Sequence, residues 1–263
     1  MKIALIGDIH ANLPALEAVL AAIAARDDVD ATYHLGDLVG YAPWPNETVA
    51  LLGSRNIAGI SGNYDSSVAT GYTHCGCKYE DPAQEALSHR SFEWTKANCS
   101  HATKRALGAL PFSLALRPLG GHAAGPQLVL VHGTPTLNTV YWHAERSDDF
   151  CRQMAALAGL KAGDVMAFGH THVPWHRVVD GMHFVNGGSA GRPKDGDWRT
   201  GFVTIAFGDG APAVAFHRLP YDVDRAAAGI ESSTLPREFA AFLRRGGTGG
   251  VATSAGTPSG TVA

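Results

Sequence analysis

Two histidines separated by a single residue follow a short apolar run. The run extends from Asp164 to Phe168, and Gly169 then leads into His170 and His172. Imidazole nitrogen is a common ligand for divalent transition metals. Because two such side chains at the end of one strand can reach two ions, we expect further ligands elsewhere in the chain.

Four other apolar runs end in polar residues next to glycine. These ends are Gly7-Asp8-x-His10, Gly36-Asp37, Gly62-Asn63-x-Asp65 and His132-Gly133. Glycine permits the tight turns and close backbone approach that a binding site requires. The candidate metal ligands are therefore Asp8, His10, Asp37, Asn63, His132, His170 and His172.

This set supplies oxygen and imidazole nitrogen but no thiolate. It suits Mn, Fe, Zn, Ni or Co, whereas calcium prefers oxygen throughout and Cu(I) prefers sulfur. Seven ligands are too many for one ion, but two ions roughly 3.5 to 4 Å apart can share Asp37. Two divalent ions bound by Asp8, Asp37 and a bridging hydroxide would keep a net charge of about +1, and this charge attracts phosphate. The hydroxide would attack phosphorus without a protein nucleophile.

Strand and helix patterns alternate in the first 60 residues. Lys2 to Ile6, Ala31 to Leu35 and Ile57 to Ile60 have strand character, and Asn12 and Pro45 begin the intervening helices. This alternation predicts a largely parallel sheet with helices on its faces. Since parallel strands bring their carboxyl ends to one edge, we expect all five motifs to meet at an edge of this sheet.

The remaining segments differ in character. We expect an inserted helical cap at about 66–110, with helices at 82–98 and 102–107, a helix at 147–157 and a closing helix at 235–245. Runs at 175–179, 182–185, 201–207 and 213–218 predict a second, mainly antiparallel sheet. We expect one domain over 1–245 and a disordered tail over 246–263.

Composition narrows the function class. The net charge of −3, from 21 basic and 24 acidic residues, gives no electrostatic footprint for a nucleic-acid polymer or an acidic membrane. No segment reads as a signal peptide or a membrane span. The four cysteines lack C-x-x-C spacing, so we expect reduced thiols in a cytoplasmic protein. No pattern indicates an oligomeric state.

The ordered motifs resemble those of the calcineurin-like metallophosphoesterase superfamily over roughly residues 1 to 220. The sequence is most similar to its compact bacterial and archaeal branch, since Asn186-Gly187-Gly188-Ser189 before Arg192 resembles that branch's Asn-Pro-Gly-Ser stretch. The resemblance implies an α/β fold, a two-sheet αββα sandwich of mixed sheets flanked by helices. It also implies two ligand sets: Asp8, His10, Asp37 and His172 for one ion, and Asp37, Asn63, His132 and His170 for the other.

The chain departs from the family pattern at Tyr64. Many relatives have histidine there, which contacts phosphate and helps protonate the leaving group. A phenol, with a pKa near 10, donates a hydrogen bond but is a poor acid at neutral pH. Tyr64 either contacts phosphate or packs over the site, and Arg192 either contacts phosphate or holds its loop. We expect Asp65 to orient a histidine such as His132 or His170.

Other residues have two interpretations each. Tyr141, Trp142 and His143 are either a stacking surface for a base or ordinary packing. The segment from His74 to Cys77 belongs either to a substrate-facing cap or to a structural turn, and His34 fits the core or a position behind the ligands.

We expect a metal-dependent phosphodiesterase for small nucleotide-like phosphoesters, with two divalent ions, Mn first and Fe, Zn, Ni or Co as alternatives. The alternatives to this function are a phosphomonoesterase, a dinucleoside polyphosphatase and a non-catalytic protein-binding scaffold of the same fold. The sequence does not specify the physiological substrate or the native metal.

Overall fold

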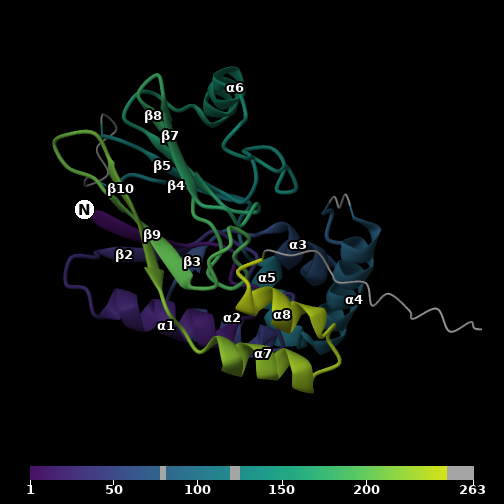
Figure 1. Ribbon diagram of the computed structural model, residues 1–263. Coiled ribbons are helices and arrows are strands. Elements are labelled where there is room, and N and C mark those ends of the chain that lie inside the picture. The colour runs from purple at the N-terminus through teal and green to yellow at the C-terminus, as the bar shows by residue number, and fades with distance from the viewer. Residues whose placement is uncertain (78–80, 119–124, 248–263) are drawn as a thin grey trace, which may run out of the picture.

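The computed structural model describes residues 1–77, 81–118 and 125–247, and these residues form two five-stranded sheets (Figure 1). The order is β10-β9-β1-β2-β3 in the first sheet and β4-β5-β6-β8-β7 in the second. The strands are β1 Lys2–Ile6, β2 Ala31–His34, β3 Ala58–Gly59, β4 Ser113–Leu116, β5 Leu128–Val131, β6 Val165–Phe168, β7 Trp175–Val179, β8 Met182–Asn186, β9 Thr200–Ala206 and β10 Ala213–Leu219. The helices are α1 Leu13–Ala24, α2 Pro45–Ser54, α3 Asn63–Thr70, α4 Pro82–Asn98, α5 His101–Gly108, α6 Asp148–Ala158, α7 Val223–Ser232 and α8 Glu238–Arg244.

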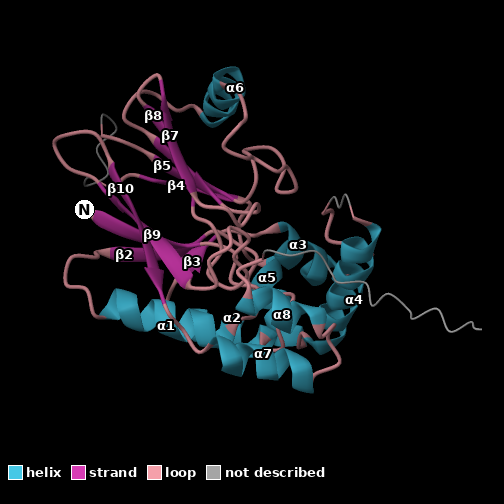
Figure 2. Ribbon diagram, in the orientation of Figure 1, coloured by secondary structure: helices cyan, strands magenta, loops and turns pink. Residues whose placement is uncertain are grey.

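The two sheets pack face to face between outer helices, as Figure 2 shows. Side chains alternate across a strand, so Leu5 of β1 enters the core between the sheets while Ile6 packs with the helices on the outer face. On the other side, α6 covers the second sheet through Cys151 and Ala155. The αββα sandwich of mixed sheets is therefore confirmed.

The first helix is tied to the loops at the carboxyl ends of the strands. Asn12 caps α1, because its Oδ1 accepts a hydrogen bond from the Ala15 amide at 3.2 Å. The other end of the same amide, Nδ2, donates to the Gly191 carbonyl at 2.8 Å. One side chain therefore starts the helix and fixes a loop that follows β8.

The predicted division into a parallel and an antiparallel sheet was wrong. Each sheet contains three parallel strands, β1-β2-β3 in the first and β5-β6-β8 in the second. The β9–β10 hairpin pairs with β1, and the β7–β8 hairpin pairs with β6 through β8. The five motifs thus follow strands of both sheets. The prediction failed because alternation identifies a strand but not its distant partner.

Three elements were not predicted: α3, β4 and α7. The sequence of α3, NYDSSVAT, has no apolar stripe, so helical periodicity gave no signal there. The expected cap segment contains most of α3 together with α4 and α5. In the expected tail, Gly246 is described, and its carbonyl accepts a hydrogen bond from the Gly196 amide at 2.9 Å. Residues 248–263 lie outside the described residues.

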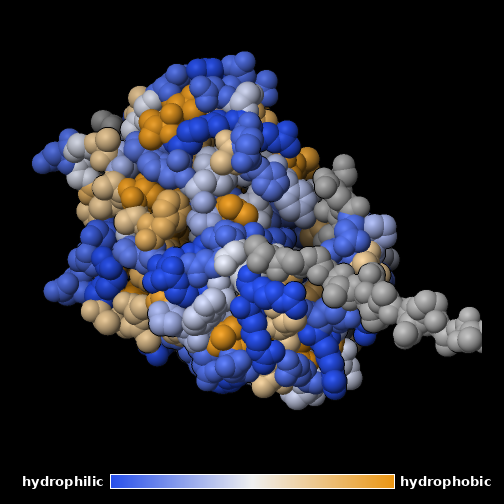
Figure 3. Space-filling model, viewed as in Figure 1, coloured by the Kyte–Doolittle hydropathy of each residue, from blue (hydrophilic) through white to orange (hydrophobic). Residues whose placement is uncertain are grey.

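The surface in Figure 3 is largely hydrophilic, with hydrophobic residues in separate groups. Within the described part of the chain, no helix combines the length and the apolar character needed to cross a bilayer.

Candidate metal centre

Six candidate ligands form two buried clusters where strands of both sheets end. One cluster is Asp8, His10 and His172, and the other is Asp37, His132 and His170; in each, the ligand atoms lie within 4.8 Å of one another. The first sheet contributes residues after β1 and β2, and the second contributes residues after β5 and β6. The site therefore lies where the two sheets meet.

The carboxylate of Asp37 lies between the clusters. Its Oδ2 is 3.7 Å from His10 Nε2 in the first cluster and 3.4 Å from His132 Nε2 in the second. Asn63 adds a seventh group, since its Oδ1 is 3.0 Å from His132 Nε2. One oxygen of Asp37 is thus positioned to bridge two ions.

The histidines present lone pairs to the site. The Nδ1 atoms of His10, His132 and His172 lie 3.1, 2.8 and 2.6 Å from the backbone carbonyls of Val39, Leu35 and Arg192 respectively. Because a carbonyl only accepts, each Nδ1 carries a proton, so each Nε2 presents a lone pair when its ring is neutral. Second partners of this kind are typical of metal-binding histidines.

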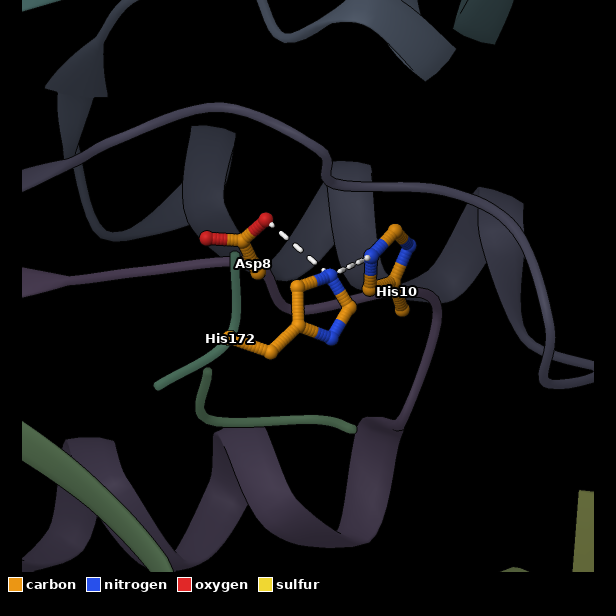
Figure 4. A group of neighbouring side chains, drawn as sticks. All are labelled: Asp8, His10 and His172. Carbon is orange, nitrogen blue, oxygen red and sulfur yellow. Dashed lines mark hydrogen bonds and ion pairs between the residues drawn. The ribbon is translucent and has the colours of Figure 1, made fainter. Parts of the chain in front are cut away.

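These lone pairs fit bound cations. The Nε2 atoms of His10 and His172 lie 3.0 Å apart, and the buried Nε2 of His170 has no hydrogen-bond partner among the described residues. Figure 4 shows the His172 ring between His10 and the Asp8 carboxylate, with Asp8 Oδ1 3.4 Å from His172 Nε2. Facing lone pairs in a buried site repel unless a cation lies between them, so the donor set fits divalent metal.

Most of the candidate ligands have strained backbone. Left-handed φ values occur at five of the seven: Asp8 39°, His10 49°, Asp37 52°, His170 67° and His172 64°. Such conformations cost roughly 1–3 kcal/mol each for residues other than glycine and concentrate at functional sites. Glycine is needed at positions 62 and 169, because a Cβ there would collide with the carboxylates of Asp37 and Asp8.

The electrostatics show which protons a metal would displace. Burial opposes ionisation of Asp37, but the charges of His132 and nearby histidines lower its pKa overall. Burial likewise opposes protonation of His132, but Asp37 raises its pKa to about 10. Burial, together with the charge of Asp37, raises the pKa of Asp8 to about 8. In the metal-free protein, protons thus balance the carboxylates, and binding of divalent ions would release them.

Asp65 acts on the backbone, so the prediction that it orients a histidine was wrong. Its Oδ1 accepts from the Leu38 amide at 2.8 Å, and its Oδ2 accepts from the Gly62 amide at 3.0 Å. Those amides directly follow Asp37 and precede Asn63 in the chain. Asp65 therefore fixes two ligand loops through their backbone amides.

Tyr64 is directed toward α4. Its hydroxyl lies 3.4 Å from Ser91 Oγ and 3.5 Å from the Ser88 carbonyl, while its ring packs edge-on against His10. Burial raises the pKa of Tyr64 well above its usual value near 10. Of the two interpretations, this placement favours packing, and it leaves Tyr64 without the function of an acid.

The side chain of Arg192 is enclosed by aromatic rings. Its guanidinium lies 4.1 Å from the ring centre of Tyr41 and 4.1 Å from that of Phe242 in α8. Tyr41 in turn packs edge-on against His10 at 4.9 Å. Since the Arg192 carbonyl also binds His172, the structure favours a loop-holding function, with α8 supporting the first cluster.

Sequence reasoning missed Lys194. Its side chain is half-buried, and its positive charge acts on the carboxylates of Asp8 and Asp37. Burial, together with the charge of Arg192, lowers the pKa of Lys194 to about 8. The sequence contained a clue to this residue, because Lys194 follows Arg192 by two residues in the glycine-rich loop.

The aromatic residues after β5 have different environments. Trp142 is buried and stacks on Phe168 at 4.4 Å, which is ordinary core packing. Tyr141 is half-buried and lies over His170 with ring centres 4.2 Å apart, and His143 is exposed. Tyr141 is therefore the member of this group that adjoins the centre. His34 is buried in the core, as one of its two interpretations expected.

Comparison with known proteins agrees with the fold and the site. A sequence profile of the calcineurin-like phosphoesterase superfamily domain matches residues 1–209, so the chain belongs to this family. It is 26% identical to an uncharacterized protein of Methanocaldococcus jannaschii over 257 residues, covering 89% of this chain and 93% of the relative.

Two solved structures are also similar. A metallophosphoesterase from Sphaerobacter thermophilus is 27% identical with a TM-score of 0.71, covering 94% of this chain and 99% of that one. A hypothetical protein from Pyrococcus horikoshii is 21% identical with a TM-score of 0.77, covering 94% and 98% of the two chains, and supports the fold alone. The predicted superfamily is therefore confirmed.

Proposed function

We propose that this protein is a metal-dependent phosphodiesterase that hydrolyses small, nucleotide-like phosphoesters with two divalent ions, Mn being our first choice. The observation that carries the proposal is the Asp37 carboxylate between two clusters of buried carboxylate and imidazole ligands. When bound, the ions would lower the pKa of water and neutralise charge on the phosphoryl oxygens. One cluster would be completed by Asp8, His10 and His172, the other by Asn63, His132 and His170.

The protein groups would position the substrate and orient the ligands. The charge of Lys194 near both carboxylates favours an anionic ester at this site. Tyr64, whose hydroxyl faces α4 and whose pKa is raised, does not supply a proton to the leaving group. This favours esters whose leaving groups need little protonation, such as aryl esters and activated diesters.

A phosphomonoesterase is the second candidate, because the added positive charge of Lys194 suits a dianionic phosphate. Side-by-side turnover of bis(p-nitrophenyl) phosphate and p-nitrophenyl phosphate separates the two. We also propose a cytoplasmic protein whose partner is a small ester rather than a nucleic-acid polymer or a membrane. The net charge of −3 and the four free cysteines support this.

The direct test uses chelator-treated protein reloaded with Mn²⁺. We expect diester turnover that depends on the metal and that falls at least roughly a hundredfold in Asp37→Asn. Asp164→Asn is the control, since Asp164 is also a buried carboxylate but lies at the opposite end of β6. A chain that binds no metal and hydrolyses neither ester would instead favour a non-catalytic scaffold.

A further inference from the structure

A cavity of about 740 Å³ lies beneath the turn at 73–77, between this turn and α4. Cavities of roughly 300–1,000 Å³ are typical of sites for small organic ligands. Its wall includes Cys75, Cys77, Ser88 and Phe92. The cavity is thus large enough for a nucleoside.

Asn63 links the wall of this cavity to the metal centre. Asn63 Nδ2 donates to the Cys75 carbonyl at 2.9 Å and to Cys77 Sγ at 3.2 Å, and both cysteines line the cavity. Oδ1 of the same amide lies 3.0 Å from His132 Nε2. Asn63 therefore borders both sites, and an ester with its phosphate at the centre and its organic group in the cavity would extend past it.

The cavity wall combines polar and aromatic side chains. Thr73, His74, Glu85 and His89 line the cavity and are exposed, so their polar groups can reach a ligand. Phe92, His74 and His89 add aromatic rings, and no lysine or arginine is among the described residues that line the cavity. This chemistry suits an uncharged, aromatic, hydrogen-bonding group.

We infer that the cavity binds the organic group carried by the substrate phosphate, an uncharged aromatic group of nucleoside size. The inference rests on the proposed function, since the phosphate must occupy the metal centre. The cavity would then determine the specificity of the enzyme, while the two clusters determine its chemistry.

The test compares thymidine 5′-(p-nitrophenyl phosphate) with methyl p-nitrophenyl phosphate, which share a leaving group and differ in the group that the cavity would bind. In Mn²⁺-loaded protein, we expect kcat/KM to be at least roughly tenfold higher for the thymidine ester. Ala86→Trp adds bulk to the cavity wall from an exposed position on α4 and should abolish this preference. Ala97→Trp, also exposed on α4 but outside the lining, should keep the wild-type ratio.

His89→Ala provides a second variant and should reduce the preference roughly fivefold by removing one hydrogen-bonding ring from the wall. The inference is overturned if the wild type hydrolyses both esters with equal kcat/KM, or if Ala86→Trp retains the preference. Hydrolysis of neither ester would overturn the proposed function and this inference with it.

Discussion

Asp65 accepts hydrogen bonds from backbone amides beside two candidate ligands. Its substitution therefore tests whether these loops support the metal centre while every ligand side chain is retained. Its two oxygens accept from the amides of Leu38 and Gly62, at 2.8 and 3.0 Å. These amides adjoin Asp37 and Asn63 in the chain. Asp65→Asn retains the shape but places an NH₂ group against one backbone N–H, so one bond is lost and two donors face each other.

The magnitude follows from the bond that is lost. Burial and the charge of Asp37 raise the pKa of Asp65 to about 7, so the carboxylate is charged at about pH 8. A hydrogen bond to a charged acceptor contributes about 1.5–3 kcal/mol, so at that pH we expect the metal-free variant to be less stable by about 2 kcal/mol. For a chain of this size, that lowers the Tm by roughly 4–8 °C. Displacement of the loops that carry Asp37 and Asn63 should weaken Mn²⁺ affinity by roughly 10- to 100-fold, as measured by calorimetric titration.

Asp164 offers a matched control. Its oxygens accept from the amides of Gln127 and Lys161, at 2.8 and 2.9 Å, and the residue is buried. It precedes β6, whose far end leads to His170, roughly 17–20 Å away at about 3.3 Å per residue. Asp164→Asn should lose similar stability but bind Mn²⁺ normally. Equal losses of affinity in the two variants, or none in Asp65→Asn, would refute the reasoning.

Three further predictions concern α8, the charged loop and the core. Phe242→Ala removes one face of the ring stack around Arg192, a contact of roughly 0.5–2 kcal/mol, and should weaken Mn²⁺ binding several-fold in titrations, whereas Phe216→Ala on exposed β10 should not. Lys194→Met should raise KM for an anionic diester by roughly tenfold without reducing metal content; an unchanged KM would contradict the assigned function of this charge. Burial lowers the pKa of His34 to about 4 from 6.5, so the unfolded chain binds the proton more tightly, and stability falls as the pH drops from about 6.5 towards 4. Between pH 7.5 and 5, the free energy of unfolding should therefore fall by about 2 kcal/mol less in His34→Leu than in the wild type, as measured by urea unfolding of metal-free protein. An unaltered pH dependence would disprove this.

The sequence predicted the ligand cluster because its signals are local. Each candidate ligand follows an apolar run and lies beside or near glycine, so strand ends and ligand types were readable together. The left-handed backbone of Asp8 and His10 could not be predicted from the sequence, since both residues make backbone hydrogen bonds to loops distant in sequence.

Long-range contacts account for the remaining errors. The β9–β10 hairpin pairs with β1, a strand far away in the sequence, and strand periodicity does not encode such a pairing. Likewise, Arg192 meets Phe242 of α8 only in the folded chain, and Asp65 meets Leu38 across 27 residues. A polar side chain near the ligands was therefore predictable, but its partner was not.

The central claim is a dinuclear centre bridged by Asp37, and the metal content of the purified chain tests it most directly. After reloading with Mn²⁺ and removal of free ions, mass spectrometric metal analysis should give two ions per chain, one for each cluster. Asp37→Ala should lose both ions, because its carboxylate lies between the clusters. A wild-type chain that binds one ion or none, or an Asp37→Ala variant that still binds two, would contradict the account.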